Sequence, residues 1–116
     1  MALEVEFAVK KDVLIIRLNG ELDHHTAEQL RTQAEQKIAE SEIKHLLFNL
    51  EGLSFMDSSG LGVMLGRYKQ ISQWGGRMMV CAISPSIHRL FELSGMFKII
   101  QLAETEDEAL DALGVA

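Results

Sequence analysis

Short apolar runs rich in β-branched residues alternate along this chain with segments in which apolar residues recur at helical spacing. The runs predict strands and the periodic segments predict helices. Strands that alternate with helices form a mostly parallel sheet with right-handed crossovers. The sequence therefore predicts an α/β fold in which the residues that follow the strands gather at one edge of the sheet.

The predicted sheet is mixed, because the chain opens with a hairpin signal. Strands at 5–9 and 13–18 flank the turn Lys10-Lys11-Asp12, and Asn19-Gly20 is expected to end the second strand. Thr26 is expected to begin a helix through a capping box with Gln29. The predicted order is ββαβαβ(α)βα, with four to five strands and about four helices. The remaining elements are expected as a helix from 27 to about 41, a strand at 45–50, a helix from Ser58 to Gly75, a strand at 77–83, a helix from Pro85 to Gly95, a strand at 99–102 and a helix after Thr105.

Length and composition fit one domain that covers residues 1–116. Apolar residues make up 47% of the chain, and the formal net charge is -6. An acidic chain without a basic stripe does not fit a nucleic-acid-binding protein. The single cysteine, Cys81, lies in an apolar run and is expected to be a buried core thiol. Because no apolar run reaches the roughly 18 residues of a membrane span, we expect a cytoplasmic protein without a membrane partner.

The most informative stretch runs from Phe55 to Tyr68, where a strand gives way to an amphipathic helix. If the helix begins at Ser59, Ser58 is its N-cap, and capping would account for it fully. The alternative is phosphorylation, since a phosphate there would meet free N–H groups and the positive end of the helix dipole. The residues alone leave both interpretations open and do not distinguish Ser58 from Ser59.

Four residues of this helix, Ser59, Gly62, Val63 and Gly66, share one face opposite the expected core face. A glycine inside a helix costs roughly 1 kcal/mol relative to alanine. Two glycines on an exposed face therefore indicate the close approach of a partner, with Val63 as the apolar contact. The alternative is that one of the glycines packs against a strand of the same domain.

A second polar loop, 20–26, is expected beside the 53–60 loop, with Ser84-Pro85 at the same edge. Asp23 in this loop either caps the following helix or meets a basic residue of a partner. The neighbouring His24 and His25 form no zinc pattern with the other histidines, so we expect no metal site.

Catalytic motifs are missing from the sequence. Residues 56–60 do not match the G-x-S-x-G elbow, and Gly60-Leu61-Gly62 is too short for a dinucleotide fingerprint. The chain also lacks a Walker A lysine. We therefore expect a protein that is not an enzyme and holds no cofactor of its own.

Three motifs are distributed over nearly the whole chain. They are Asn19-Gly20-Glu21-Leu22-Asp23, Asp57-Ser58-Ser59-Gly60-Leu61-Gly62, and Leu90-Phe91-Glu92-Leu93-Ser94-Gly95-Met96-Phe97. Together they resemble the STAS-domain anti-sigma factor antagonists. The sequence Gly66-Arg67-Tyr68-Lys69-Gln70 is similar in particular to the antagonists that control a sporulation sigma factor.

The resemblance implies a partner-switching mechanism. The unphosphorylated protein, expected to be a monomer when free, would bind a dimeric anti-sigma factor that is also a serine kinase, and so release the sigma factor. The kinase, using ATP that it binds itself, would then phosphorylate the serine after the motif's aspartate, here Ser58, and binding would end. A serine phosphatase would restore the protein. The residues expected to contact the partner are Asp23, Asp57, Ser58, Ser59, Gly60, Gly62, Val63 and Gly66.

Two other functions compete with this one. The domain would be a phosphocarrier or a small-ligand-binding regulatory domain if the serine or His24 passed a phosphate onward. A further alternative is a subunit of a larger stress-sensing assembly, which the same fold can serve.

Overall fold

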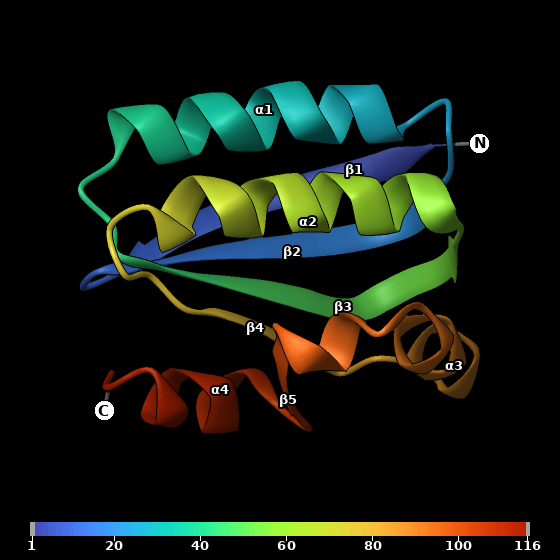
Figure 1. Cartoon of the computed structure of the whole chain (residues 1–116). Helices are drawn as coiled ribbons and strands as arrows, with labels where there is room; N and C mark the ends of the chain where they lie inside the picture. The colour runs from blue at the N-terminus through green and yellow to red at the C-terminus, as the bar shows by residue number, and fades with distance from the viewer. Residues whose placement is uncertain (1, 116) are drawn as a thin grey trace.

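The computed structural model describes residues 2–115, which form a five-stranded sheet with helices on both faces (Figure 1). The strands are β1 (Leu3–Lys10), β2 (Val13–Leu22), β3 (His45–Met56), β4 (Met78–Cys81) and β5 (Gln101–Ala103). The helices are α1 (Ala27–Glu40), α2 (Ser58–Ser72), α3 (Pro85–Ser94) and α4 (Glu106–Ala112), with a short 3-10 turn η1 (Met96–Lys98) before β5.

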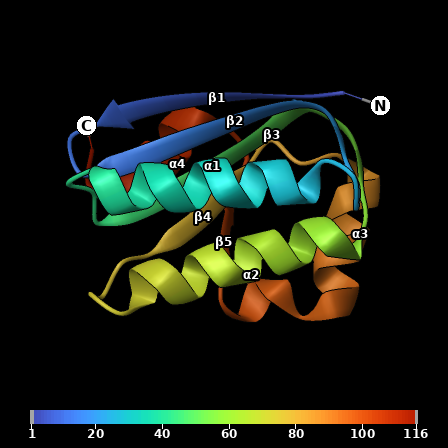
Figure 2. The ribbon, with the colours of Figure 1, turned by 90° about the horizontal axis from the view of Figure 1, so that it is seen from above.

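The strands follow the chain order across the sheet, from β1 to β5. The β1–β2 hairpin is antiparallel, whereas the other three pairs are parallel, as the alternation of strands and helices predicts. Helices α1 and α2 lie side by side over one face, and α4 covers part of the other (Figure 2). The predicted order and the mixed sheet are therefore confirmed.

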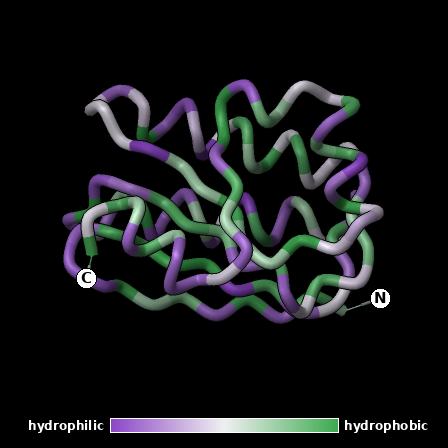
Figure 3. Tube along the Cα trace, turned by 90° about the horizontal axis from the view of Figure 1, so that it is seen from below, coloured by the Kyte–Doolittle hydropathy of each residue, from purple (hydrophilic) through white to green (hydrophobic). Residues whose placement is uncertain are grey.

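The core is divided by the sheet, because successive side chains of a strand point to opposite faces. Leu14 and Ile16 face α1 and α2, whereas Val13 and Ile15 face α4 together with Cys81. The edge strand β1 alternates between hydrophobic and hydrophilic residues over its first five positions and ends in a hydrophobic run before Lys10 (Figure 3). Cys81 is fully buried, and burial raises the pKa of its thiol to about 12, so the expected core thiol is confirmed.

The expectation that Asn19-Gly20 ends the second strand is wrong. Strand β2 continues to Leu22, with shifts of its register against β3 on either side of the Asn-Gly pair. Gly20 has a φ of +108°, which a glycine adopts without strain, so the pair forms an irregularity within the strand. Strand β3 is likewise longer than predicted and ends at Met56, which pairs with Leu22.

Both later helix starts follow their predicted caps. The Ser84 hydroxyl accepts a hydrogen bond from Ile87 N at the start of α3, and the Thr105 hydroxyl accepts one from Glu108 N at the start of α4. Gly95 ends α3 in the left-handed conformation, with a φ of +78°. Local capping rules thus fix the ends of these helices.

Helix α4 is tied to the sheet by the carboxylate of Glu106. Arg17 on β2 donates from Nε to Oε1 at 2.8 Å and from Nη2 to Oε2 at 2.9 Å. Asn49 on β3, a polar residue in an otherwise apolar run, donates to the same Oε1 at 3.0 Å. The hydrogen bonds from Arg17 are the largest cause that lowers the pKa of Glu106, to about 2.

Replacing Glu106 tests this connection. Because the folded-state pKa of Glu106 is below its ordinary value of about 4.5, its stabilisation is present above pH 4.5 and is lost as the pH falls towards 2. Glu106→Gln should lower the free energy of unfolding by about 1–3 kcal/mol at pH 7 and by roughly half as much at pH 3, because the folded-state pKa is still lower than 3. Urea unfolding at both pH values measures this. Asp107→Asn, which removes an exposed charge from the same helical turn, should change little; an equal loss in both variants would contradict the assignment.

Candidate functional site

The loops that follow β2 and β3 meet at one edge of the sheet. Leu22 pairs with Met56, the last residue of β3. The residue after Met56, Asp57, donates its backbone N–H to Leu22 O at 3.2 Å. Asp23 and Asp57 thus follow paired residues on adjacent strands. The starts of α1 and α2 and the helix α3 lie at this end of the molecule, as predicted for the loops 20–26, 53–60 and 84–85 (Figure 1).

Asp57, and not Ser58, is the N-cap of α2. Its backbone is extended, and its carboxylate accepts a hydrogen bond from Ser59 N at 2.9 Å. The helix begins one residue earlier than a Ser58 cap would require, and Ser58 is its exposed first residue. Because the aspartate caps the helix, the Ser58 hydroxyl is not needed for that role, and the interpretation of Ser58 as the cap is wrong.

The Asp23 loop is ordered by its own side chains. The Asp23 carboxylate accepts hydrogen bonds from His25 N at 2.9 Å and Thr26 N at 3.0 Å. The Thr26 hydroxyl accepts from Asp23 N and donates to Glu21 O. Thr26 therefore forms no capping box, contrary to the prediction, because the loop already uses its hydroxyl. The hydrogen bond from Thr26 N is the largest cause that lowers the pKa of Asp23, so a fixed carboxylate lies at this edge.

The predicted partner-facing residues of α2 differ in their exposure. A Cβ on Gly60 would lie 2.8 Å from Leu22 Cδ2, so this glycine is packed against the core. A Cβ on Gly62 or Gly66 would meet nothing within 4 Å, which contradicts the alternative that they pack against a strand. Val63 is only 6% exposed and belongs to the core, so its expected place on an exposed face is wrong.

Gly62 and Gly66 border a groove of about 310 Å³ between α1 and α2. Because α1 lies along α2, the buried face of α2 is wider than its own apolar spacing indicates. The β2–α1 loop closes one end of the groove. The lining residues are His24, Ala27, Glu28, Arg31, Ser59, Gly62, Val63, Gly66 and Arg67.

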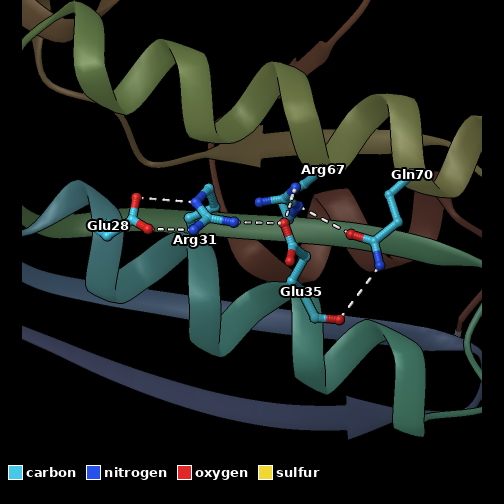
Figure 4. A network of polar contacts seen from close by, with 5 residues as sticks. All are labelled: Glu28, Arg31, Glu35, Arg67 and Gln70. Carbon is cyan, nitrogen blue, oxygen red and sulfur yellow. Dashed lines mark hydrogen bonds and ion pairs between the residues drawn. The ribbon is translucent and has the colours of Figure 1, made fainter.

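Sequence reasoning missed a charged network that joins the two helices (Figure 4). Arg67 on α2 is buried, and its Nη2 donates to Glu35 Oε2 on α1 at 3.2 Å. The sequence did contain a signal for the burial of Arg67. Arg67 follows Val63 by four residues and Gly60 by seven, which places all three on one face of a helix. All three belong to the buried face of α2.

The histidines of the β2–α1 loop lie at the surface. His24 and His25 are exposed, with ring centroids 4.0 Å apart. No group of three or more His, Cys, Asp or Glu side chains within residues 2–115 is placed to hold a metal ion. Within the same range, every helix is too short or too polar to cross a membrane.

A model of the STAS domain family matches residues 4–109. The chain belongs to the STAS domain family. A relative from Paenibacillus polymyxa, named an anti-sigma F factor antagonist, is 49% identical over 99% of this chain and 98% of its own. Another of that name, from Lysinibacillus sphaericus, is 41% identical over 89% of this chain and 87% of its own.

Solved structures of SpoIIAA share the fold of this STAS domain. The unphosphorylated anti-sigma factor antagonist SpoIIAA is 36% identical, with a TM-score of 0.76 over 99% of this chain and 100% of that one. SpoIIAA in its phosphorylated form, described as a Bacillus cell fate determinant, is 38% identical, with a TM-score of 0.74 over 97% and 99%. The resemblance found in the motifs is confirmed.

The two residues at the start of α2 should differ in their effect on stability. Asp57→Ala removes the cap and should lower the free energy of unfolding by about 1 kcal/mol. Ser58→Ala should change it by less than about 0.5 kcal/mol, because Ser58 is exposed and is not the cap. Chemical denaturation of both variants measures the difference. The reverse order of the two effects would show that Ser58 caps the helix in solution.

Gly60 and Gly62 form a second matched pair on the same helix. Gly60→Ala should destabilise the fold by about 1–3 kcal/mol, because its methyl group would crowd Leu22 and Met56. Gly62→Ala should stabilise it by up to about 1 kcal/mol, because alanine favours the helix and the space is open. Melting temperatures of the two variants test this, and a loss of stability in Gly62→Ala would mean that this position is packed.

Proposed function

We propose that this STAS domain is an anti-sigma F factor antagonist whose binding is ended by phosphorylation of Ser58. The similarity to antagonists of that name over the full length of the chain carries the proposal. The position of Ser58 supports the choice of phosphoacceptor, because it is exposed and the aspartate before it caps the helix. The domain is then a binding protein and a kinase substrate, and not an enzyme.

The partner in this proposal is a dimeric anti-sigma factor that is also a serine kinase and supplies the ATP. The unphosphorylated monomer binds it and releases the sporulation sigma factor, and a serine phosphatase later restores the phosphorylated protein. The docking surface combines the ordered Asp23 loop with the start of α2. Its residues are Asp23, Asp57, Ser58, Ser59, Gly60, Gly62, Val63 and Gly66, among which Gly60 and Val63 support the surface from the core.

Electrostatics explain how one phosphate ends binding. The phosphate adds a charge of about -1.5 to -2 at pH 7 beside the carboxylates of Asp57 and Asp23. The Asp57 carboxylate already accepts from Ser59 N, so the phosphate competes for the donors of the helix start and extends outward. A phosphate dianion held against a partner surface loses its hydration. The free energy lost in this way weakens the complex unless a positive group of the partner pairs with the phosphate. The fold need not change, since Ser58 is exposed.

The direct test incubates the protein with ATP and the anti-sigma F factor of the same organism. Intact mass analysis should show one added phosphate, and peptide mapping should place it on Ser58. Ser58→Ala should take up none, whereas Ser59→Ala should still take up one phosphate, although its labelling can be slower because Ser59 belongs to the docking surface. Label on Ser59 would refute the assignment, and label acquired from a phosphodonor without kinase would indicate a phosphocarrier.

Binding measurements complete this test. Ser58→Asp should bind the anti-sigma factor at least about tenfold more weakly than the wild type, a difference of about 1.4 kcal/mol. Isothermal titration calorimetry with Ser58→Asn as the neutral control separates charge from side-chain size. Equal affinities for the Asp and Asn variants would rule out the electrostatic mechanism.

A further inference from the structure

The guanidinium of Arg67 lies buried between α1 and α2 with one nitrogen unpaired. Its side chain is 7% exposed, Nε donates to Gln70 Oε1 at 3.1 Å, and Nη2 donates to Glu35 Oε2 at 3.2 Å. Nη1 is buried and has no acceptor among the atoms of residues 2–115. A buried donor without an acceptor is costly to the fold, and an arginine nitrogen more so because it is charged.

The nearby carboxylate of Glu35 does not satisfy this nitrogen. Glu35 Oε2 accepts from Arg31 Nη1 at 3.0 Å as well as from Arg67 Nη2, and Arg31 is paired in addition with Glu28 (Figure 4). Neither oxygen of Glu35 accepts a hydrogen bond from Arg67 Nη1. The missing acceptor is therefore best supplied from outside the domain.

A groove lies next to Arg67, although Nη1 itself is buried. Arg67 lines the groove between α1 and α2, and the two glycines of α2 that border the groove leave it unfilled. In Figure 4 the free nitrogen of Arg67 points towards Arg31, whose side chain is 41% exposed and can turn outward. Arg67 follows Ser59 by eight residues, or about 12 Å along the helix. An extended partner segment that begins over the start of α2 covers this distance, and so reaches Arg67, within about four residues.

We propose that this groove receives an acidic side chain of the anti-sigma factor, whose carboxylate accepts a hydrogen bond from Arg67 Nη1 after Arg31 turns aside. The partner's backbone then lies against Gly62 and Gly66, where any side chain on α2 would hold it away. A carboxylate is the fitting acceptor because hydrogen bonds between a guanidinium and a carboxylate are strengthened by both charges. This inference rests on the proposed function and names the chemistry of the contact.

Variants of α2 test the groove separately from Ser58. Arg67→Met keeps an unbranched, buried side chain but removes the donors, and Glu35 keeps its partner Arg31. It should bind the anti-sigma factor at least tenfold more weakly while its melting temperature stays within a few degrees of the wild type. Gly66→Ala should also weaken binding several-fold although its helix is more stable. Lys69→Ala, an exposed change on the same helix, should bind like the wild type.

A double-mutant cycle identifies the acid. Each Asp or Glu on the anti-sigma factor's binding face is changed to its amide and titrated against wild type and Arg67→Met. One amide variant should weaken binding to the wild type at least tenfold and have little further effect on Arg67→Met. If Arg67→Met fails to fold, Arg67→Lys replaces it, since lysine keeps the charge near Glu35 but lacks the second nitrogen.

The outcomes separate this inference from the proposed function. Failure of the wild type to bind the anti-sigma factor refutes both. Wild-type binding that Ser58→Asp abolishes, with Arg67→Met and Gly66→Ala unaffected, refutes the groove alone. The groove contact is also refuted if no partner acid couples to Arg67, or if the variants change self-association in sedimentation instead of partner binding.

Discussion

The pairing of β2 with β3 is the contact on which the site depends. The two strands remain parallel partners through the irregularity at Asn19 and Gly20, up to the pair Leu22–Met56. Only because this pairing continues to the strand ends do the Asp23 and Asp57 loops emerge side by side, joined by the hydrogen bond from Asp57 N to Leu22 O. A strand that ended at Asn19, as local turn rules predict, would leave the two loops without this connection.

Within these loops, the two aspartates and Thr26 form the hydrogen bonds that hold the structure, whereas Ser58 does not. The carboxylates of Asp23 and Asp57 accept the backbone hydrogen bonds that order the loop and begin α2. The Thr26 hydroxyl is also committed, to Glu21 O. Ser58 carries none of these roles. The proposed phosphorylation of Ser58 would therefore modify a residue that the fold does not need.

The sequence predicted the element order well and the details of the site less well, for physical reasons. The spacing of apolar residues differs between strands and helices, so each element can be predicted from its own residues. The caps at Ser84 and Thr105 likewise involve only neighbouring residues. The cap of α2 was misplaced by one residue because Asp57, Ser58 and Ser59 are all good capping residues. Tertiary packing decided the other cases. Helix α1 lies along the face of α2 that carries Val63 and Arg67, and both are buried. The spacing within α2 places these residues on one face but does not show that α1 covers it.

The distribution of unfavourable features over the helices separates supporting elements from functional ones. Helix α4 satisfies its local rules, with a side-chain cap, acids in its first turn and Glu106 paired to the sheet. Helix α2 instead carries Gly62 and Gly66 beside open space and Arg67 with an unpaired buried nitrogen. Each feature alone lowers stability, yet all three border the same groove. Such costs gather at functional sites. In the proposed function, the groove and the Ser58 edge would therefore form one continuous binding surface.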